Sequence, residues 1–155
     1  MSYVITGLDP APFAHLYGLS DAALAAAGAV RMIADARPGY PCRVTLADAE
    51  PGEAVLLVNH EHLAVDTPYR SRHAIFVAEG ADGPARYESA IPEQLRCRLL
   101  SVRAFDAEDM MIDAEVLDGT GLETQIARMF ADPRAAYLHV HNARRGCFAA
   151  RVDRT

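Results

Sequence analysis

Two pairs of histidines have the spacing with the clearest chemical potential. His139 and His141 are separated by one residue, and His60 and His62 repeat that spacing just beyond an expected strand. Side chains alternate faces along a β-strand, so His139 and His141 share one face of the strand expected to carry them. Neutral imidazole is a common zinc ligand, and a catalytic zinc site needs a third protein ligand. We expect no metal or cofactor from this pattern, because histidines that only bond nearby carbonyls show it too. A metal-dependent enzyme that uses His139 and His141 with His60 or His62, with zinc as the metal, is the alternative hypothesis.

A second set of polar residues would suit a small anionic ligand. Arginine and tyrosine follow Pro68, a further arginine lies in an expected strand, and the last hairpin adds histidine and asparagine. Guanidinium groups pair with carboxylate or phosphate, and neutral donors orient the ligand. The alternative is a set of solvated surface ion pairs, each worth about 0–1 kcal/mol. We expect a pocket for a small anionic metabolite or peptide carboxylate, lined by Tyr69, Arg70, Arg103, His139, His141 and Asn142.

Thiol chemistry is a weaker hypothesis. Cys147 lies across the last expected hairpin from the histidine-bearing strand, and Cys42 precedes an arginine. A nucleophilic cysteine needs a base within hydrogen-bond distance, and the sequence places none. Buried cysteine also acts as a small hydrophobic residue. The sequence leaves the role of Cys147 open.

The composition excludes several classes of function. All fifteen basic residues are arginine, so the chain lacks the lysine of a Schiff base or of a Walker-type phosphate loop. The net charge of -6 argues against general binding to nucleic acid or to anionic membranes. Three widely spaced cysteines and the absence of a signal-like N-terminus favour a soluble cytoplasmic protein. A third hypothesis is a protein-interaction module, whose apolar sheet face docks a partner or a second copy of the chain as a homodimer.

The pattern of apolar residues predicts one α+β domain over residues 1–155. Ser20 and Gly28 delimit one expected helix, and an apolar stripe over 122–131 predicts another. About seven short strands are expected, with no regular βαβ alternation, so a mostly antiparallel sheet with helices on one face is favoured. These strands cover 29–34, 53–59, 74–78, 99–105 with 110–117 as one hairpin, and 136–141 with 147–152 as another.

Several short motifs together resemble one family of bacterial proteins. The matching segments are Pro-Gly-Tyr-Pro-Cys-Arg at 38–43, Pro-Tyr-Arg-Ser at 68–71, Ala-Ile-Phe-Val at 74–77, and His-Val-His-Asn-Ala at 139–143 followed by Gly146 and Cys147. They are similar to domain of unknown function family 1203, over nearly the whole chain. The resemblance implies a stand-alone bacterial domain and supplies no activity, cofactor or catalytic residue.

Overall fold

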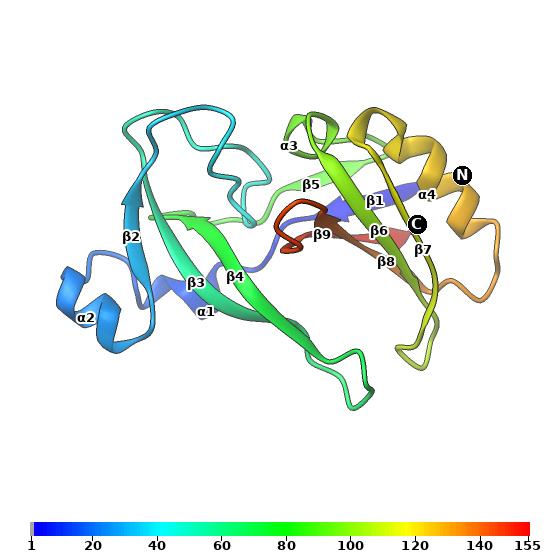
Figure 1. The fold of residues 1–155 in the computed structure, drawn as a ribbon, viewed down its shortest axis with the longest axis horizontal. Coiled ribbons are helices and arrows are strands. Elements are labelled where there is room, and N and C mark those ends of the chain that lie inside the picture. The colour runs from blue at the N-terminus through cyan, green and yellow to red at the C-terminus, as the bar shows by residue number, and fades with distance from the viewer. Residues whose placement is uncertain (1) are drawn as a thin grey trace.

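The computed structural model describes residues 2–155, which form nine strands in two separate antiparallel sheets (Figure 1). The strands are β1 (Tyr3–Thr6), β2 (Val30–Ile33), β3 (Ala54–Leu63), β4 (Ser71–Ala78), β5 (Arg86–Glu88), β6 (Leu99–Phe105), β7 (Met111–Asp118), β8 (Tyr137–Asn142) and β9 (Phe148–Arg154). The larger sheet has the order β5-β1-β9-β8-β6-β7, and the smaller has the order β2-β3-β4. The expected α+β class is confirmed, with more strands than the seven predicted.

The two additional strands at the edge of the larger sheet are short. β1 and β5 have four and three residues, and β1 pairs with both β9 and β5. Neither run shows an alternation that marks it as a strand in the sequence. Their pairing depends on β9, which lies more than 140 residues away from β1 in the chain.

Four short helices and one 3-10 turn complete the fold of residues 2–155. They are α1 (Ala11–Ala14), α2 (Asp21–Ala26), α3 (Glu93–Arg96), the 3-10 turn η1 (Gly119–Gly121) and α4 (Leu122–Phe130). The predicted cap of α2 is confirmed, because the Ser20 hydroxyl accepts a hydrogen bond from the amide of Ala23 at 3.1 Å. No helix of residues 2–155 has the length and apolar character needed to cross a bilayer.

The main core lies between α4 and one face of the larger sheet. The predicted apolar stripe of α4 is confirmed, since Leu122, Ile126 and Phe130 are fully or almost fully buried. They pack in one cluster with residues of β8, including Leu138 and Val140. A second core joins α1 and α2 to the smaller sheet. Each sheet therefore has its own apolar packing.

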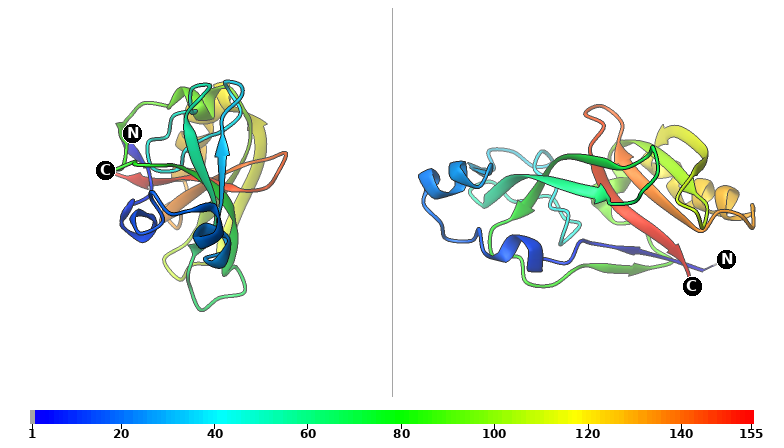
Figure 2. Two further views of the ribbon diagram at one scale, coloured as in Figure 1. Left: turned by 90° about the vertical axis from the view of Figure 1, so that its left-hand side faces the viewer. Right: turned by 90° about the horizontal axis from the view of Figure 1, so that it is seen from below.

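Backbone contacts join the two sheets into an elongated molecule with the chain termini close together (Figures 1 and 2). Gly7, at the end of β1, bonds to Ala85, and the next amide donates to the carbonyl of Arg43. A Cβ atom at Gly7 would lie 2.0 Å from the carbonyl oxygen of Val44, so this approach requires glycine. These backbone contacts hold the smaller sheet beside the face of the larger sheet that α4 does not cover.

β3 is longer than the sequence predicts. Its expected end was Asn59, but the strand continues to Leu63 and includes both His60 and His62. This prediction was wrong because polar residues occupy the second half of the strand, where the larger sheet covers them. This extension brings Leu63 into a cluster with Phe105 and Tyr137 of the larger sheet.

Candidate functional site

β8 positions two histidines on the face of the larger sheet that lies opposite α4. Leu138 and Val140 point into the main core, and the alternating residues Tyr137, His139 and His141 take the other face. This alternation was predicted, and the structure confirms it. His139 and His141 are each only 2% exposed. The two imidazoles are therefore held inside the protein.

A third histidine comes from the smaller sheet. His62 lies near the end of β3, and its ring stacks on Phe148 of β9 with centroids 5.2 Å apart and planes 7° apart. The same ring lies 5.0 Å from the ring of His141 and 6.0 Å from that of His139. His62 thus contributes from a sheet different from the one that carries the other two histidines.

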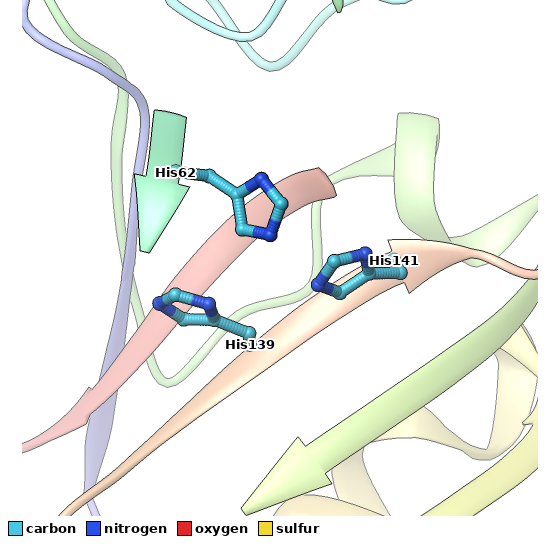
Figure 3. A group of neighbouring side chains, drawn as sticks. All are labelled: His62, His139 and His141. Atoms are coloured by element: carbon cyan, nitrogen blue, oxygen red, sulfur yellow. The ribbon is translucent and has the colours of Figure 1, made fainter. Parts of the chain in front are cut away.

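The three rings form a compact group. One nitrogen of each ring can be chosen so that all three lie within 4.8 Å of one another. Figure 3 shows the rings of His62, from one strand, and of His139 and His141, from another, grouped around a common space. We call these residues the three-histidine cluster.

The orientation of His141 is fixed by the turn between β8 and β9. Its Nδ1 lies 2.9 Å from the carbonyl oxygen of Gly146, which can only accept a hydrogen bond, so Nδ1 carries the proton. Nε2 is then an unprotonated acceptor. Gly146 has a φ of 80°, a conformation that favours glycine and that shapes the turn. A hydrogen bond to one ring nitrogen is the usual way to orient a metal-binding histidine.

His139 contains a buried polar atom without a partner. Its Nδ1 is fully inaccessible and has no hydrogen-bond partner among residues 2–155. The ring is surrounded by aromatic neighbours, with Phe105 and Phe148 at 5.4 and 5.0 Å between centroids. A buried polar group left unpaired costs about 1–3 kcal/mol, so this nitrogen calls for a physical explanation.

The cluster strongly favours neutral imidazole. Burial lowers the pKa of His139 to about 3, and the neighbouring His141 and His62 contribute to that decrease. Burial also lowers the pKa of His141 to about 3, against the opposing effect of its bond to Gly146. The pKa of His62 falls to about 4, chiefly through burial. Neutral imidazole is the form that coordinates a metal ion.

Arg103 brings a positive charge to the edge of the cluster. It lies on β6 opposite His139 in the strand register, and its Nη1 is 3.5 Å from Nε2 of His141. Burial lowers the pKa of Arg103. The expected position of Arg103 on a strand next to the histidines agrees with this register. The guanidinium can donate to the free lone pair of His141 or to a bound anion.

The other expected pocket residues lie in different places. Tyr69 packs edge-on against Phe105 with centroids 6.0 Å apart. Arg70 is more than half exposed and pairs with Glu61 at 2.7 Å and with Asp66 at 3.4 Å. Asn142 faces the thiol of Cys147, with Nδ2 3.7 Å from Sγ. Only Arg103, His139 and His141 of the expected set share one site.

His60 is separated from His62 although both lie on β3. Its ring packs against Phe13 with centroids 5.5 Å apart, and the strand register shifts between His60 and Leu63. The expected zinc ligands are thus reduced to three. Sequence reasoning missed Phe148, on which His62 stacks, and the carbonyl of Gly146. Backbone carbonyls leave no sequence signal, but Phe148 follows Cys147 in the hairpin that was predicted.

The fold and the site define an antiparallel α+β protein with a buried histidine cluster between two sheets. A family model described as protein of unknown function, DUF1203, matches residues 39–154. The chain belongs to this family, as the sequence motifs indicated. No curated protein matches the chain, and no solved structure does.

Proposed function

We propose that this protein binds a divalent transition metal, for which zinc is the best match, through the three-histidine cluster. The observation that carries the proposal is the convergence of three imidazoles, with one nitrogen of each within 4.8 Å of the others. Within this group Nδ1 of His139 is buried and unpaired, one of seven such side-chain atoms among residues 2–155. A metal ion would accept its lone pair and remove the cost of leaving it unbonded. Zinc, copper, iron and nickel all accept imidazole ligands.

The geometry requires only a small adjustment of the rings. Tetrahedral coordination with Zn–N distances of about 2.0–2.1 Å separates the ligand nitrogens by about 3.3 Å. The three candidate nitrogens already lie within 4.8 Å of one another. Rotations of the side chains can close this difference without a change in the strands. The support from Gly146 already fixes His141 in the tautomer that coordinates through Nε2.

Three protein ligands leave one tetrahedral position open, and Arg103 lies beside it. We further propose that a small anion occupies this position, held by the metal and by the guanidinium. A cation so near a metal ion is unfavourable unless a negative charge lies between them. Zinc also lowers the pKa of a bound water to about 7, so the same position would suit a hydrolytic reaction.

The competing explanation for the cluster is aromatic packing. His139 contacts two phenylalanine rings and His62 stacks on one of them, as apolar side chains do in a core. Packing explains the neutral state of the rings but not the unpaired nitrogen. Leucine or phenylalanine would fill this space without burying a polar atom.

Zinc titration of untagged, metal-free protein by calorimetry tests the proposal. We expect one zinc ion per chain, and an affinity more than about 100-fold weaker in His139→Leu and in His62→Gln, beyond the range typical of outer-shell substitutions. His60→Gln is the matched control on the same strand, and its affinity should equal that of the parent protein. The metal assignment is wrong if zinc does not bind, or if His60→Gln weakens binding as much as His62→Gln.

We also place the protein in the cytoplasm. The three cysteines are free, and the Cys97 thiol is exposed. Free thiols are typical of a reducing compartment. Fractionation of cells that express the untagged chain tests this part of the proposal, and recovery from a secreted or periplasmic fraction contradicts it.

A further inference from the structure

A cavity lies beside the turn between β8 and β9. Its volume is about 1010 Å³, and it is lined by the smaller sheet, by the turn and by the segment after α3. Its lining includes Arg43, Asn142 and Cys147, whereas the three-histidine cluster lies outside it. We call this space the arginine cleft.

The charge of the arginine cleft is opposite to that of the whole protein. The chain has a net charge of -6, yet the cleft is lined by five arginines and two aspartates. Two of these arginines are already paired, Arg98 with Asp48 and Arg96 with Glu93, so three remain against the two aspartates. One aspartate, Asp35, accepts a hydrogen bond from Tyr40. Arg144 and Arg145 are exposed at the rim, and within residues 2–155 neither forms an ion pair. The local excess of positive charge would attract anions.

Arg43 lies at the base of the cleft and is 1% exposed. Its guanidinium donates to the carbonyl of Phe148 at 2.8 Å, to the carbonyl of Pro41, and to Sγ of Cys147 at 3.0 Å. None of these three partners is a carboxylate, and Arg43 has no ion pair with an acidic residue in the described part of the chain. A buried charge without a counter-charge is expensive, so an anion held in the cleft would stabilise Arg43 through space, while its three nitrogens keep their partners in the protein.

Apolar and aromatic side chains form the opposite wall. Met32, Leu57 and Phe76 come from the smaller sheet, and the ring of Tyr40 packs against Phe76 with centroids 5.3 Å apart. This volume is much larger than an inorganic anion needs, and it lies at the upper end of the range for small-molecule sites. The cleft therefore combines a cationic base and rim with an apolar wall.

We propose that the arginine cleft binds a small organic molecule that carries an oxyanion, a phosphate or carboxylate, on an apolar or aromatic body. The oxyanion lies toward Arg43, Arg144 and Arg145, and the body lies against Tyr40 and Phe76. Planar guanidinium groups match both oxyanions through paired hydrogen bonds. This site is separate from the three-histidine cluster, and its ligand needs no metal.

Thermal shift and calorimetry with phenyl phosphate, benzoate and neutral benzamide test the proposal, in the presence of a chelator. We expect phenyl phosphate to raise the Tm by several degrees when it is well above its Kd, and benzamide to have no effect. Benzoate distinguishes the two oxyanions: a phosphate site binds it more weakly than phenyl phosphate, and a carboxylate site binds it at least as well.

Variants at the exposed rim avoid the risk of unfolding that a change at Arg43 carries. Arg144→Gln and Arg145→Gln should each weaken the binding of the preferred probe by about tenfold. Arg86→Gln, an exposed arginine elsewhere, is the matched control and should bind as the parent protein does. His139→Leu should also bind normally, which separates this site from the metal site.

Three results would overturn the proposal. The first is no binding of either anionic probe at about 10 mM, a concentration well above the Kd of typical metabolite sites. The second is equal loss of affinity in Arg86→Gln and in the rim variants. The third is loss of binding in His139→Leu, which would place the anion at the three-histidine cluster instead.

Discussion

The two faces of β8 are equally buried but chemically different. Leu138 and Val140 face α4 in an aliphatic core, whereas His139 and His141 face β3 and the ring of Phe148. Aliphatic side chains would fill both faces at lower cost, because buried imidazole nitrogens need partners. One face therefore stabilises the fold, and the other keeps polar atoms at a cost in stability. This cost is what we expect of a binding site.

The largest change in the free energy of unfolding should come from a substitution on the aliphatic face of β8. Leu138→Ala removes a fully buried side chain from the main core, and we expect it to lower the free energy of unfolding by about 2–5 kcal/mol. Urea denaturation measures this change. Zinc affinity of the folded variant should stay within about threefold of the parent protein, well below a change of 1.4 kcal/mol. A strong loss of zinc binding would show that the two faces are not independent.

Acid should destabilise the metal-free protein, because the buried histidines of β8 stay neutral in the folded state. The pKa values of His139 and His141 are about 3 in the folded state, below the usual 6.5, so only the unfolded chain takes up protons as the pH falls from 7. Stability is highest above pH 6.5 and decreases toward pH 3. Between pH 7 and 5.5 the loss should be about 1 kcal/mol for each of these two histidines.

Chemical denaturation at several pH values, with a chelator present, measures this dependence. His139→Leu should lose about a third of this dependence, because His62, with a pKa of about 4, contributes about as much as His139 and His141 do. A protein whose unfolding free energy is constant between pH 7 and 5.5 contradicts the neutral, buried state of the cluster.

Replacement of one imidazole should raise the free energy of unfolding of the metal-free protein, whereas a typical core mutation lowers it. His139→Leu removes the unpaired Nδ1 and keeps an apolar side chain in contact with Phe105 and Phe148. We expect the metal-free variant to be more stable than the parent protein by about 1–2 kcal/mol at neutral pH. Urea denaturation in chelator is the measurement. A loss of more than about 2 kcal/mol, the size of a core truncation, would assign His139 to packing.

The smallest expected effect is a change in zinc affinity when Arg103 is replaced. Arg103→Met removes a positive charge 3.5 Å from Nε2 of His141 and keeps much of the side chain's apolar length. Zinc affinity without added anion should increase by about fivefold, which corresponds to about 1 kcal/mol. Phosphate added to the zinc-loaded variant should bind more weakly than to the parent protein. Calorimetry gives both values, and a decrease in zinc affinity contradicts the assigned position of the charge.

The sequence predicted the strands of the larger sheet better than it predicted the site. Alternation along β8 placed His139 and His141 on one face, and the hairpin patterns placed Arg103 on a neighbouring strand. Both of these predictions depend on local periodicity in the sequence. Motifs in residues 38–147 also indicated the family that the match over residues 39–154 shows.

No local feature of the sequence predicts how the two sheets pack against each other. Tyr69 and Arg70 are adjacent to each other in the chain, yet one packs on Phe105 and the other pairs with Glu61 at the surface. His60 and His62 share a strand but contact different neighbours, because β3 shifts register beyond His60 and ends against the larger sheet. Only tertiary packing decides which of these polar residues meet.

Zinc-edge anomalous diffraction from crystals of the untagged protein grown with zinc tests the central claim most directly. We predict one strong peak about 2.0–2.1 Å from one ring nitrogen each of His62, His139 and His141. A structure with the three rings in the positions described and no anomalous peak between them would contradict the claim.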